Sequence, residues 1–396
     1  MKKLLMISFD AVGDLEYEQL LQYPNFSALA AKAETHRNVQ TVFLSNTYPI
    51  HASVVTGVHP AVHGLISNTE PFPCHNPVWL CEDRLLKATP LWQAAAEQGI
   101  ETAAVLWPAT ARSRHIRYNI PEVLARPGKS QVLANFSAGS KGLQLQLFLR
   151  YRHLLKGIQQ PQRDAFATAC MADIMRRHRP GLMLMHLTCY DTLCHQYGKD
   201  YGRLATAFAA LDANLGALLA AADGETSVVV FSDHSQITVH TVLQPNLVLL
   251  RQGLLGKTQA DWQPGPANCF VECCGGSAFL HPGNLLPAQI EELKALFAQS
   301  GGFHRFLTEK EMQACGRGNL PFGFCAAAGY CYEAHHSEEK GNHGYPLNYP
   351  DYSVFYMAYG PAFEAGKTLQ GGSLLELAPL AAKELGLRLP QLNSAV

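Results

Sequence analysis

The sequence has few charged residues and no long uninterrupted apolar run. Charged side chains make up 16% of the 396 residues, and the formal net charge is -1 at pH 7. Because Lys and Arg are spread along the chain, we expect no nucleic-acid-binding surface and no electrostatic attraction to a membrane. No apolar stretch reaches the roughly 18 residues of a membrane span. The apolar part of MKKLLMISFD ends at Asp10 and is short for a signal peptide, so we expect a first buried strand there.

Cysteine is present but not in a pattern that cross-links small proteins. Eleven cysteines are scattered from Cys74 to Cys331, and no C-x-x-C pair occurs among them. An odd number without such spacing indicates neither a disulfide framework nor a zinc knuckle. We therefore expect reduced thiols and a cytoplasmic protein.

Apolar side chains are abundant, at 47% of the chain, and they alternate between two patterns. Nearly continuous apolar runs predict buried strands, and longer periodic segments between them predict helices. The predicted strands are 2–9, 101–107, 181–187, 226–232 and 353–359, and the predicted helices are 24–34, 89–99, 163–178, 201–222 and 373–386. This order predicts an α/β protein, a three-layer αβα sandwich around a mostly parallel sheet.

Two regions interrupt the alternation of strands and helices. Residues 112–160 are mixed and basic, and residues 260–340 are rich in Gly, Cys and aromatic residues. We interpret both as insertions that flank the active site of one catalytic domain spanning residues 1–396. In sheets of this kind, functional residues gather at the carboxyl ends of the strands.

Carboxylates and imidazoles follow several predicted strands at the point where each strand ends. They are Asp10, Asp191 with His195, and Asp233 with His234, and His343 lies between glycines before the 353–359 strand. Asp191 and His195 are four residues apart, so one helical turn places both on one face. Nitrogen and oxygen ligands in these numbers suit two ions and favour zinc over magnesium.

Each of these residues taken singly has an ordinary structural explanation. An Asp after a strand is commonly a turn residue or a helix cap, and a lone His is commonly a packed side chain. However, anionic groups aimed at one edge of a sheet repel one another unless a cation neutralises them. The set as a whole therefore favours a metal centre.

The order of these motifs resembles the alkaline phosphatase superfamily, in particular its nucleotide pyrophosphatase/phosphodiesterase branch. The motifs are ISFD, SNTYPIHASVVTGVHPAVHG, AVLWPAT, the D-x-x-x-H of residues 191–195, SDH and GNHGY, within about residues 3–392. The resemblance implies an alkaline phosphatase-like fold with two zinc ions, one bound by Asp10, Asp233 and His234 and the other by Asp191, His195 and His343. WPA, SDHS and GNHGYPLN depart from the usual forms of these motifs, which affects the substrate pocket rather than the ligands.

The same resemblance places the nucleophile at Thr47, which also binds one zinc ion. The alternative is that Thr47 only caps the helix that HASVVTG forms. Asn68 resembles a phosphate-contacting asparagine that donates in the transition state, with a turn residue as the competing interpretation. For His51, His59 and His63 we favour a role in shaping the turn over metal binding.

The mechanism implied is two in-line displacements, in which Thr47 attacks phosphorus and water then releases the phosphate from the threonine. No Arg or Lys lies within the nucleophile motif, which favours a phosphodiester or nucleotide over a phosphomonoester. The alternatives are a phosphonate or phosphomonoester hydrolase of the same superfamily and, in another class, a non-catalytic binding module. Trp107, Tyr118 and Phe72 are aromatic candidates for stacking a substrate ring, although for each of them taken singly we favour buried packing.

Overall fold

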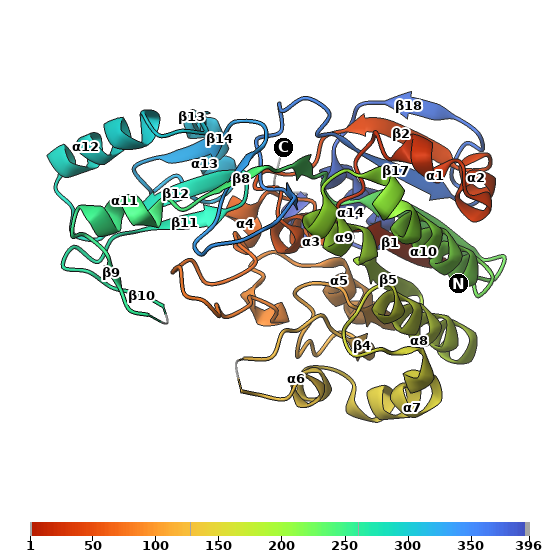
Figure 1. The fold of residues 1–396 in the computed structure, drawn as a ribbon. Helices are drawn as coiled ribbons and strands as arrows, with labels where there is room; N and C mark the ends of the chain where they lie inside the picture. Colours follow the sequence, from red (N-terminus) through yellow and green to blue (C-terminus); the bar gives the residue numbers. More distant parts are fainter. Residues whose placement is uncertain (1, 127, 260, 393–396) are drawn as a thin grey trace.

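A computed structural model describes residues 2–126, 128–259 and 261–392, and its centre is an eight-stranded sheet (Figure 1). The strand order is β18-β2-β17-β6-β1-β5-β3-β4. The strands are β1 (Lys3–Phe9), β2 (Glu34–Val39), β3 (Thr102–Val105), β4 (Tyr118–Ile120), β5 (Leu182–Leu187), β6 (Thr226–Ser232), β17 (Val354–Tyr359) and β18 (Thr368–Gln370). Neighbours from β6 through β1, β5 and β3 to β4 are parallel, and β17 is antiparallel to both of its neighbours.

The sheet is mostly parallel, as the sequence predicts, and all five predicted strands form. Residues Leu4–Phe9 of β1 and all of β6 are buried, as expected for strands covered on both faces. The predicted helix 24–34 is too long, because α2 (Pro24–Ala30) ends early and β2 begins at Glu34. The sequence did not predict β2, β4 and β18, whose short or polar segments lie at and near the sheet edges.

Helices cover both faces of the sheet and produce the predicted three layers. Side chains of β1 alternate between two cores, with Leu5 and Ile7 in one and Leu4 and Met6 in the other. The first core contains α2, α8 (Gln162–His178), α9 (Cys189–Tyr197) and α10 (Tyr201–Leu219). The second contains α3 (Thr47–Thr56), α5 (Leu91–Glu97) and α14 (Leu377–Leu385). This arrangement leaves the carboxyl ends of the parallel strands at one edge.

The two regions that interrupt the alternation fold differently from each other. Residues 112–160 contain β4, α6 (Gln131–Ala138), α7 (Lys141–Tyr151) and the short 3-10 helix η2 (Arg152–Leu154). Residues 260–340 contain all four strands of a second, antiparallel sheet with the strand order β11-β12-β14-β13. Its strands are β11 (Phe270–Cys274), β12 (Ser277–His281), β13 (Phe303–Phe306) and β14 (Gly323–Ala326), and α12 (Pro287–Ala298) packs on it. That both are insertions in a single domain stays a prediction.

The remaining short elements connect these layers. They are the helices α1 (Tyr17–Leu20), α4 (Pro60–His63), α11 (Asn246–Arg251) and α13 (Glu309–Ala314), the 3-10 helices η1 (Asp83–Leu85), η3 (Leu374–Glu376) and η4 (Pro390–Leu392), and the strands β7 (Ile237–Thr238), β8 (Thr241–Leu243), β9 (Gly256–Lys257), β10 (Trp262–Gln263), β15 (Tyr330–Tyr332) and β16 (Gly341–Asn342). Among the described residues, no helix combines the length and the apolar content that crossing a bilayer requires.

Candidate active site

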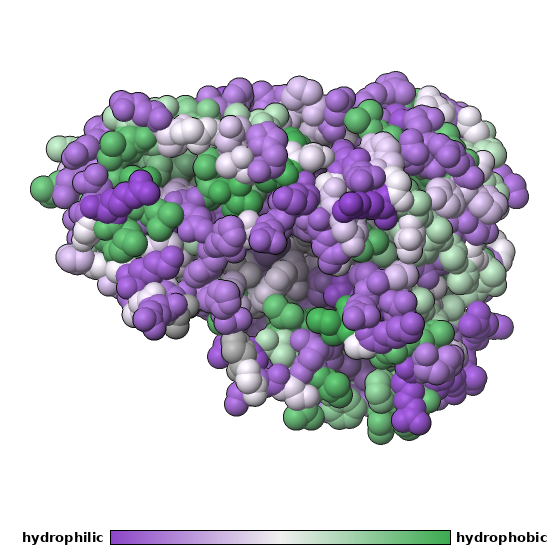
Figure 2. Space-filling model, in the orientation of Figure 1, coloured by the Kyte–Doolittle hydropathy of each residue, from purple (hydrophilic) through white to green (hydrophobic). Residues whose placement is uncertain are grey.

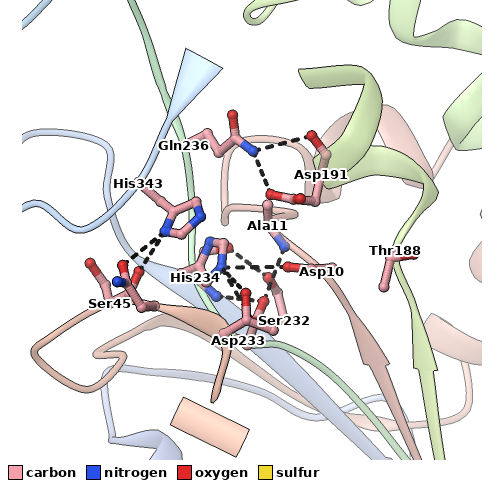
Figure 3. A network of polar contacts seen from close by, with 12 residues as sticks. Asp10, Ala11, Ser45, Thr188, Asp191, Ser232, Asp233, His234, Gln236 and His343 are labelled. Carbon is pink, nitrogen blue, oxygen red and sulfur yellow. Dashed lines mark hydrogen bonds and ion pairs between the residues drawn. The ribbon is translucent and has the colours of Figure 1, made fainter. Parts of the chain in front are cut away.

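The polar residues predicted at the strand ends meet at one edge of the central sheet (Figure 3). Asp10 follows β1, Asp233 and His234 follow β6, and Asp191 lies in the first turn of α9 just after β5. His343 arrives from the loop after β16 and stacks on His234, with ring centroids 4.1 Å apart. The structure therefore brings these side chains together from segments far apart in the sequence.

We call Thr47, Asp10, Asp233 and His234 the inner half-site. His234 Nε2 lies at its centre, 3.3 Å from Thr47 Oγ1 and 3.4 Å from both Asp10 Oδ1 and Asp233 Oδ2. Ligand atoms about 2.0–2.1 Å from a tetrahedral ion lie about 3.3–3.4 Å from one another. Asp10 Oδ1 and Asp233 Oδ2 are buried and have no hydrogen-bond partner in the described structure. The distances between these ligand atoms, and the two carboxylate oxygens without a hydrogen-bond partner, together fit a bound metal ion.

We call Asp191, His195 and His343 the outer half-site. Asp191 Oδ1 lies 3.3 Å from His195 Nε2 and accepts a hydrogen bond of 2.6 Å from Gln236 Nε2. Asp191 and His343 form one group of possible ligands with His234 of the inner half-site. Each of the three offers a ligand atom, and these atoms lie within 4.8 Å of one another. The ring of His195 lies farther out, 5.4 Å from that of His343 between centroids. The donor set again suits zinc, although His195 is not part of the compact group.

In the inner half-site, burial and mutual repulsion disfavour two charged carboxylates that have no cation beside them. Burial raises the pKa of Asp10 well above its usual value, and the charge of Asp233 raises it further. Burial likewise raises the pKa of Asp233 to about 7 and lowers that of His234 to about 4. A neutral imidazole offers the lone pair that a metal ligand needs, and a cation would compensate the two carboxylates.

The outer half-site carries its own compensating charge. Burial alone would raise the pKa of Asp191, but the charge of His195 holds it well below its usual range. Burial lowers the pKa of His343 well below its usual value, so its ring is neutral. His343 Nδ1 lies 3.0 Å from the carbonyl oxygen of Ser45 and donates to it, which turns Nε2 towards the site.

A glycine next to His343 permits this approach. Gly344 has a φ of 84°, and a Cβ there would lie 1.9 Å from the carbonyl oxygen of Cys274. Any other residue at this position would displace the backbone that carries His343.

Thr47 is the first residue of α3, and the N-cap position belongs to Asn46. The interpretation of Thr47 as the cap is therefore wrong. Asn68 Oδ1 accepts a hydrogen bond of 2.9 Å from the backbone N–H of Tyr48, directly after Thr47. Asn68 thus stabilises the start of α3, and this contact leaves its amide nitrogen for other partners.

Of the three histidines in the Thr47 motif, His59 and His63 have the structural positions that we expect. His59 precedes α4, and His63 Nε2 lies 2.9 Å from Ser53 Oγ of α3. His51 instead lies next to the candidate site. Its Nδ1 donates to the carbonyl oxygen of Thr47 at 2.8 Å and is 3.6 Å from Asp233 Oδ2. His51 therefore contacts both the backbone of Thr47 and a candidate metal ligand.

Sequence reasoning also missed His186 and Gln236. His186 is fully buried in β5, and its Nε2 lies 3.1 Å from Asp10 Oδ2. Gln236 directly follows the SDHS motif and holds Asp191. A histidine within the apolar run LMLMHL and an amide next to the SDH motif are the signals that could have indicated them.

A cleft of about 240 Å³ opens beside Thr47 and Asp10. Its other lining residues are Tyr48, Trp79, Glu122, Val123, Leu124, Arg163, Thr188, Asp191 and Thr192. Trp79 stands across from Tyr48, with ring centroids 5.3 Å apart. Figure 2 shows a hollow near the centre of this face of the molecule.

The three aromatic candidates from the sequence do not line this cleft. Trp107 is fully buried in the core, Tyr118 stacks on His178, and Phe72 packs on Phe270. For each of them, packing is the role that the structure supports. The partly exposed aromatic side chain of the cleft is instead Trp79, which packs beside the buried Tyr48.

Comparisons with known proteins agree with this architecture. A family model described as type I phosphodiesterase/nucleotide pyrophosphatase matches residues 4–298. The chain is 24% identical over 246 residues to a bis(5'-adenosyl)-triphosphatase of Xenopus laevis, covering 59% of this chain and 46% of that protein. It is 23% identical over 230 residues to venom phosphodiesterase 2 of Crotalus adamanteus, covering 54% and 24%. The chain thus spans less than half the length of these curated relatives.

Solved structures match over nearly the whole chain. Murine ectonucleotide pyrophosphatase/phosphodiesterase 5, as an inactive threonine-to-alanine variant in complex with AMP, superposes with a TM-score of 0.72 and 18% identity. The human protein gives the same TM-score and identity, and each match covers 98% of this chain and 96% of the other. At this identity, the match shows a shared fold and confirms the predicted α/β class.

Proposed function

Because the chain belongs to the type I phosphodiesterase/nucleotide pyrophosphatase family, as its motifs indicate, we propose that it hydrolyses phosphodiester or pyrophosphate bonds through Thr47 and two zinc ions. The observation that carries the proposal is the position of Thr47 Oγ1. It lies 3.3 Å from His234 Nε2, at the start of α3 and beside the cleft. A nucleophile needs this combination of a ligand environment and access to substrate.

The inner and outer half-sites would each hold one zinc ion. Bound zinc supplies Lewis-acid chemistry, which lowers the pKa of a coordinated hydroxyl and stabilises charge on phosphoryl oxygens. Thr47, Asp10, Asp233 and His234 would bind the first ion, and Asp191, His195 and His343 the second. The unmet oxygens of Asp10 and Asp233 and the ligand separations near 3.3 Å support this assignment.

The residues of the chain have distinct tasks in the proposed reaction. Thr47 Oγ attacks phosphorus, the bond to the leaving oxygen breaks in line, and water then cleaves the bond between Thr47 and the phosphate. The amide nitrogen of Asn68 donates to a non-bridging phosphate oxygen, where charge develops in the transition state. The N-terminus of α3 adds a favourable field for that charge.

A nucleotide is the substrate class that we propose. Trp79 is a partly exposed aromatic side chain of the cleft on which a base can stack, with the buried Tyr48 packed beside it, and Glu122 offers an acceptor for hydroxyl groups in the same cleft. The AMP complex of the murine structural neighbour and the triphosphatase among the relatives support this class.

The test is a rate comparison on nitrophenyl esters of a phosphodiester, a phosphomonoester and a phosphonate, together with the metal content of the purified protein. We expect fastest hydrolysis of the diester, about two zinc ions per chain, and loss of activity on chelation that zinc restores. Full activity in a metal-free preparation would contradict the proposal.

A phosphomonoesterase is the second candidate, and Arg163 is the observation that favours it. A monoester carries one more negative charge, and Arg163 is a cationic residue that lines the same cleft as Thr47. Arg163 also donates to Thr188 Oγ1, which fixes its position. Arg163→Gln should lower the kcat/KM for a monoester by about tenfold or more and spare the diester, if a monoester is the true substrate.

We further propose a cytoplasmic location. All eleven cysteines are unpaired, most of them in the buried core, which agrees with a reducing compartment. Cell fractionation combined with thiol labelling of the unfolded protein tests this, because an oxidised cysteine pair would argue for an exported protein.

A further inference from the structure

The segment 123–162 has a charge balance unlike that of the whole chain. It contains no Asp or Glu, whereas the chain carries 32 of them in 396 residues. Its basic residues are Arg126, Lys129, Lys141, Arg150, Arg152 and Lys156. All of them except Arg150 are exposed, and Arg150 pairs with Asp173 of α8 and so ties the segment to the core. This segment is therefore locally basic, although the net charge of the whole chain is only -1.

The same segment exposes an unusual share of apolar side chains. Seven of the twelve exposed large hydrophobic residues in the described part of the chain lie between residues 124 and 158. They are Leu124, Val132, Leu133, Leu145, Phe148, Leu149 and Ile158. Figure 2 shows apolar and polar residues intermingled along the lower edge of the molecule, where Figure 1 places α6 and α7. Apolar exposure of this extent marks an interaction surface.

Helix α7 has two apolar faces, and only one of them is used inside the molecule. Leu147 is buried in the core, and Leu143 and Tyr151 pack against it from the same face. Leu145, Phe148 and Leu149 point outward, with 51%, 38% and 60% of their surface exposed. Lys141 and Arg152 lie at the two ends of this outward stripe and are exposed. The stripe therefore combines apolar side chains with flanking cations.

We propose that α6, α7 and their flanking loops form a docking surface for an anionic lipid membrane. Helices that lie in a bilayer interface combine Leu and Phe side chains, which enter the acyl boundary, with Lys and Arg, which bind acidic headgroups. The two helices lie along the lower edge of the molecule in Figure 1, and their outward apolar side chains are exposed to solvent. Exposed side chains at an outer edge of the molecule can enter lipid.

The docking surface adjoins the active-site cleft. Val123 and Leu124 belong to the segment and also line the cleft, and Leu124 is 56% exposed. Docking would bring the mouth of the cleft close to the headgroups. Resting on the proposed function, this position gives a phosphodiester in an amphiphile direct access to Thr47.

The first test is cosedimentation of the zinc-loaded full chain with vesicles of phosphatidylcholine alone or mixed with phosphatidylserine. We expect binding to the anionic vesicles only, weakened by salt. The double variant Lys141→Gln/Arg152→Gln should lose about fivefold in affinity for each cation removed. The triple variant Leu145→Gln/Phe148→Gln/Leu149→Gln should lose about a thousandfold in affinity, on the order of tenfold for each apolar side chain.

A matched control replaces exposed apolar residues elsewhere, in Val62→Gln/Leu286→Gln, and should bind vesicles like the unmodified chain. Equal binding to neutral and anionic vesicles, or equal loss in the control, would overturn the proposal. So would light scattering that shows dimers which the triple variant dissociates, because the surface would then join two copies.

Activity separates this inference from the proposed function. The triple variant should hydrolyse a dissolved phosphodiester at the rate of the unmodified chain, since none of its three residues lines the cleft. Vesicle binding by a chain that hydrolyses no phosphodiester would support the docking surface and refute the proposed function. Hydrolysis of a phosphodiester by a chain that binds no vesicles would support the proposed function and refute the docking surface.

Discussion

The two half-sites differ in what holds their side chains. In the inner half-site, Asp233 Oδ1 accepts backbone N–H groups from Ala11 and His234, at 3.0 and 2.9 Å. In the outer half-site, Asp191 Oδ1 accepts a hydrogen bond from the side chain of Gln236, and His195 Nδ1 lies 3.6 Å from Glu339 Oε2. Backbone amides just after two strands therefore hold Asp233 of the inner half-site, whereas side chains from neighbouring loops support Asp191 and His195 of the outer one.

Thr47→Ala should have the largest effect, because it removes the proposed nucleophile from the inner half-site. We expect turnover of a phosphodiester to fall by at least about a thousandfold while the metal content stays unchanged. Steady-state kinetics and elemental analysis of the same preparation measure both quantities.

Thr47→Ser is the matched control for that change. It keeps the attacking oxygen and should retain measurable activity, although without the γ-methyl its rotamer is less restricted. Near-normal turnover in Thr47→Ala would mean that water attacks phosphorus directly and that Thr47 has a structural role.

The next largest effect should follow removal of one carboxylate from each half-site. Asp233→Asn and Asp191→Asn should each lose about one zinc ion per chain and lower activity by on the order of a hundredfold or more. Asn at 233 keeps the oxygen that accepts from Ala11 and His234, so the fold should persist. If both variants retained two ions, the ligand assignment would be wrong.

The inner half-site was the more predictable from the sequence. Asp10, Asp233 and His234 directly follow strands that apolar runs identify, and parallel strands end at a common edge. The residues that support these ligands were harder to predict from the sequence, because the pairing of β5 with β1 is what brings His186 next to Asp10. Trp79 lines the cleft and is held by an isolated β-bridge to Thr69, which no periodic sequence pattern predicts.

The fold shows the same division. Strands buried on both faces, such as β6, have an apolar pattern that identifies them, whereas β2 reads ETHRNV and exposes polar side chains near the sheet edge. The sheet of β11–β14 lies in a region that composition identified only as irregular. Its strands β11 and β12 form a hairpin around two glycines, but β12 and β13 both pair with β14 across longer separations that no local pattern indicates.

Gln236→Ala should weaken the outer half-site alone. Loss of its hydrogen bond frees the Asp191 carboxylate, and changes of this kind typically cost about 10- to 100-fold in metal affinity. Zinc titration monitored by calorimetry should show one weakened site and one unchanged. Gln252→Ala, at an exposed position after α11, is the control and should change neither site. A loss spread equally over both sites would remove the distinction between the half-sites.

The smallest effect concerns the order in which the metal-free protein takes up zinc. Asp233 and His234 are fully buried and held by the backbone, whereas Asp191 and His195 have side chains about one fifth exposed. A preorganised site loses less conformational freedom on binding, so the inner half-site should fill first, with an affinity higher by about tenfold. In Asp191→Asn the tighter step should remain, and in Asp233→Asn only the weaker one. If Asp191→Asn abolished the tighter step instead, the outer half-site would be the stronger, and its side-chain supports would hold the ligands at least as firmly as the sheet does.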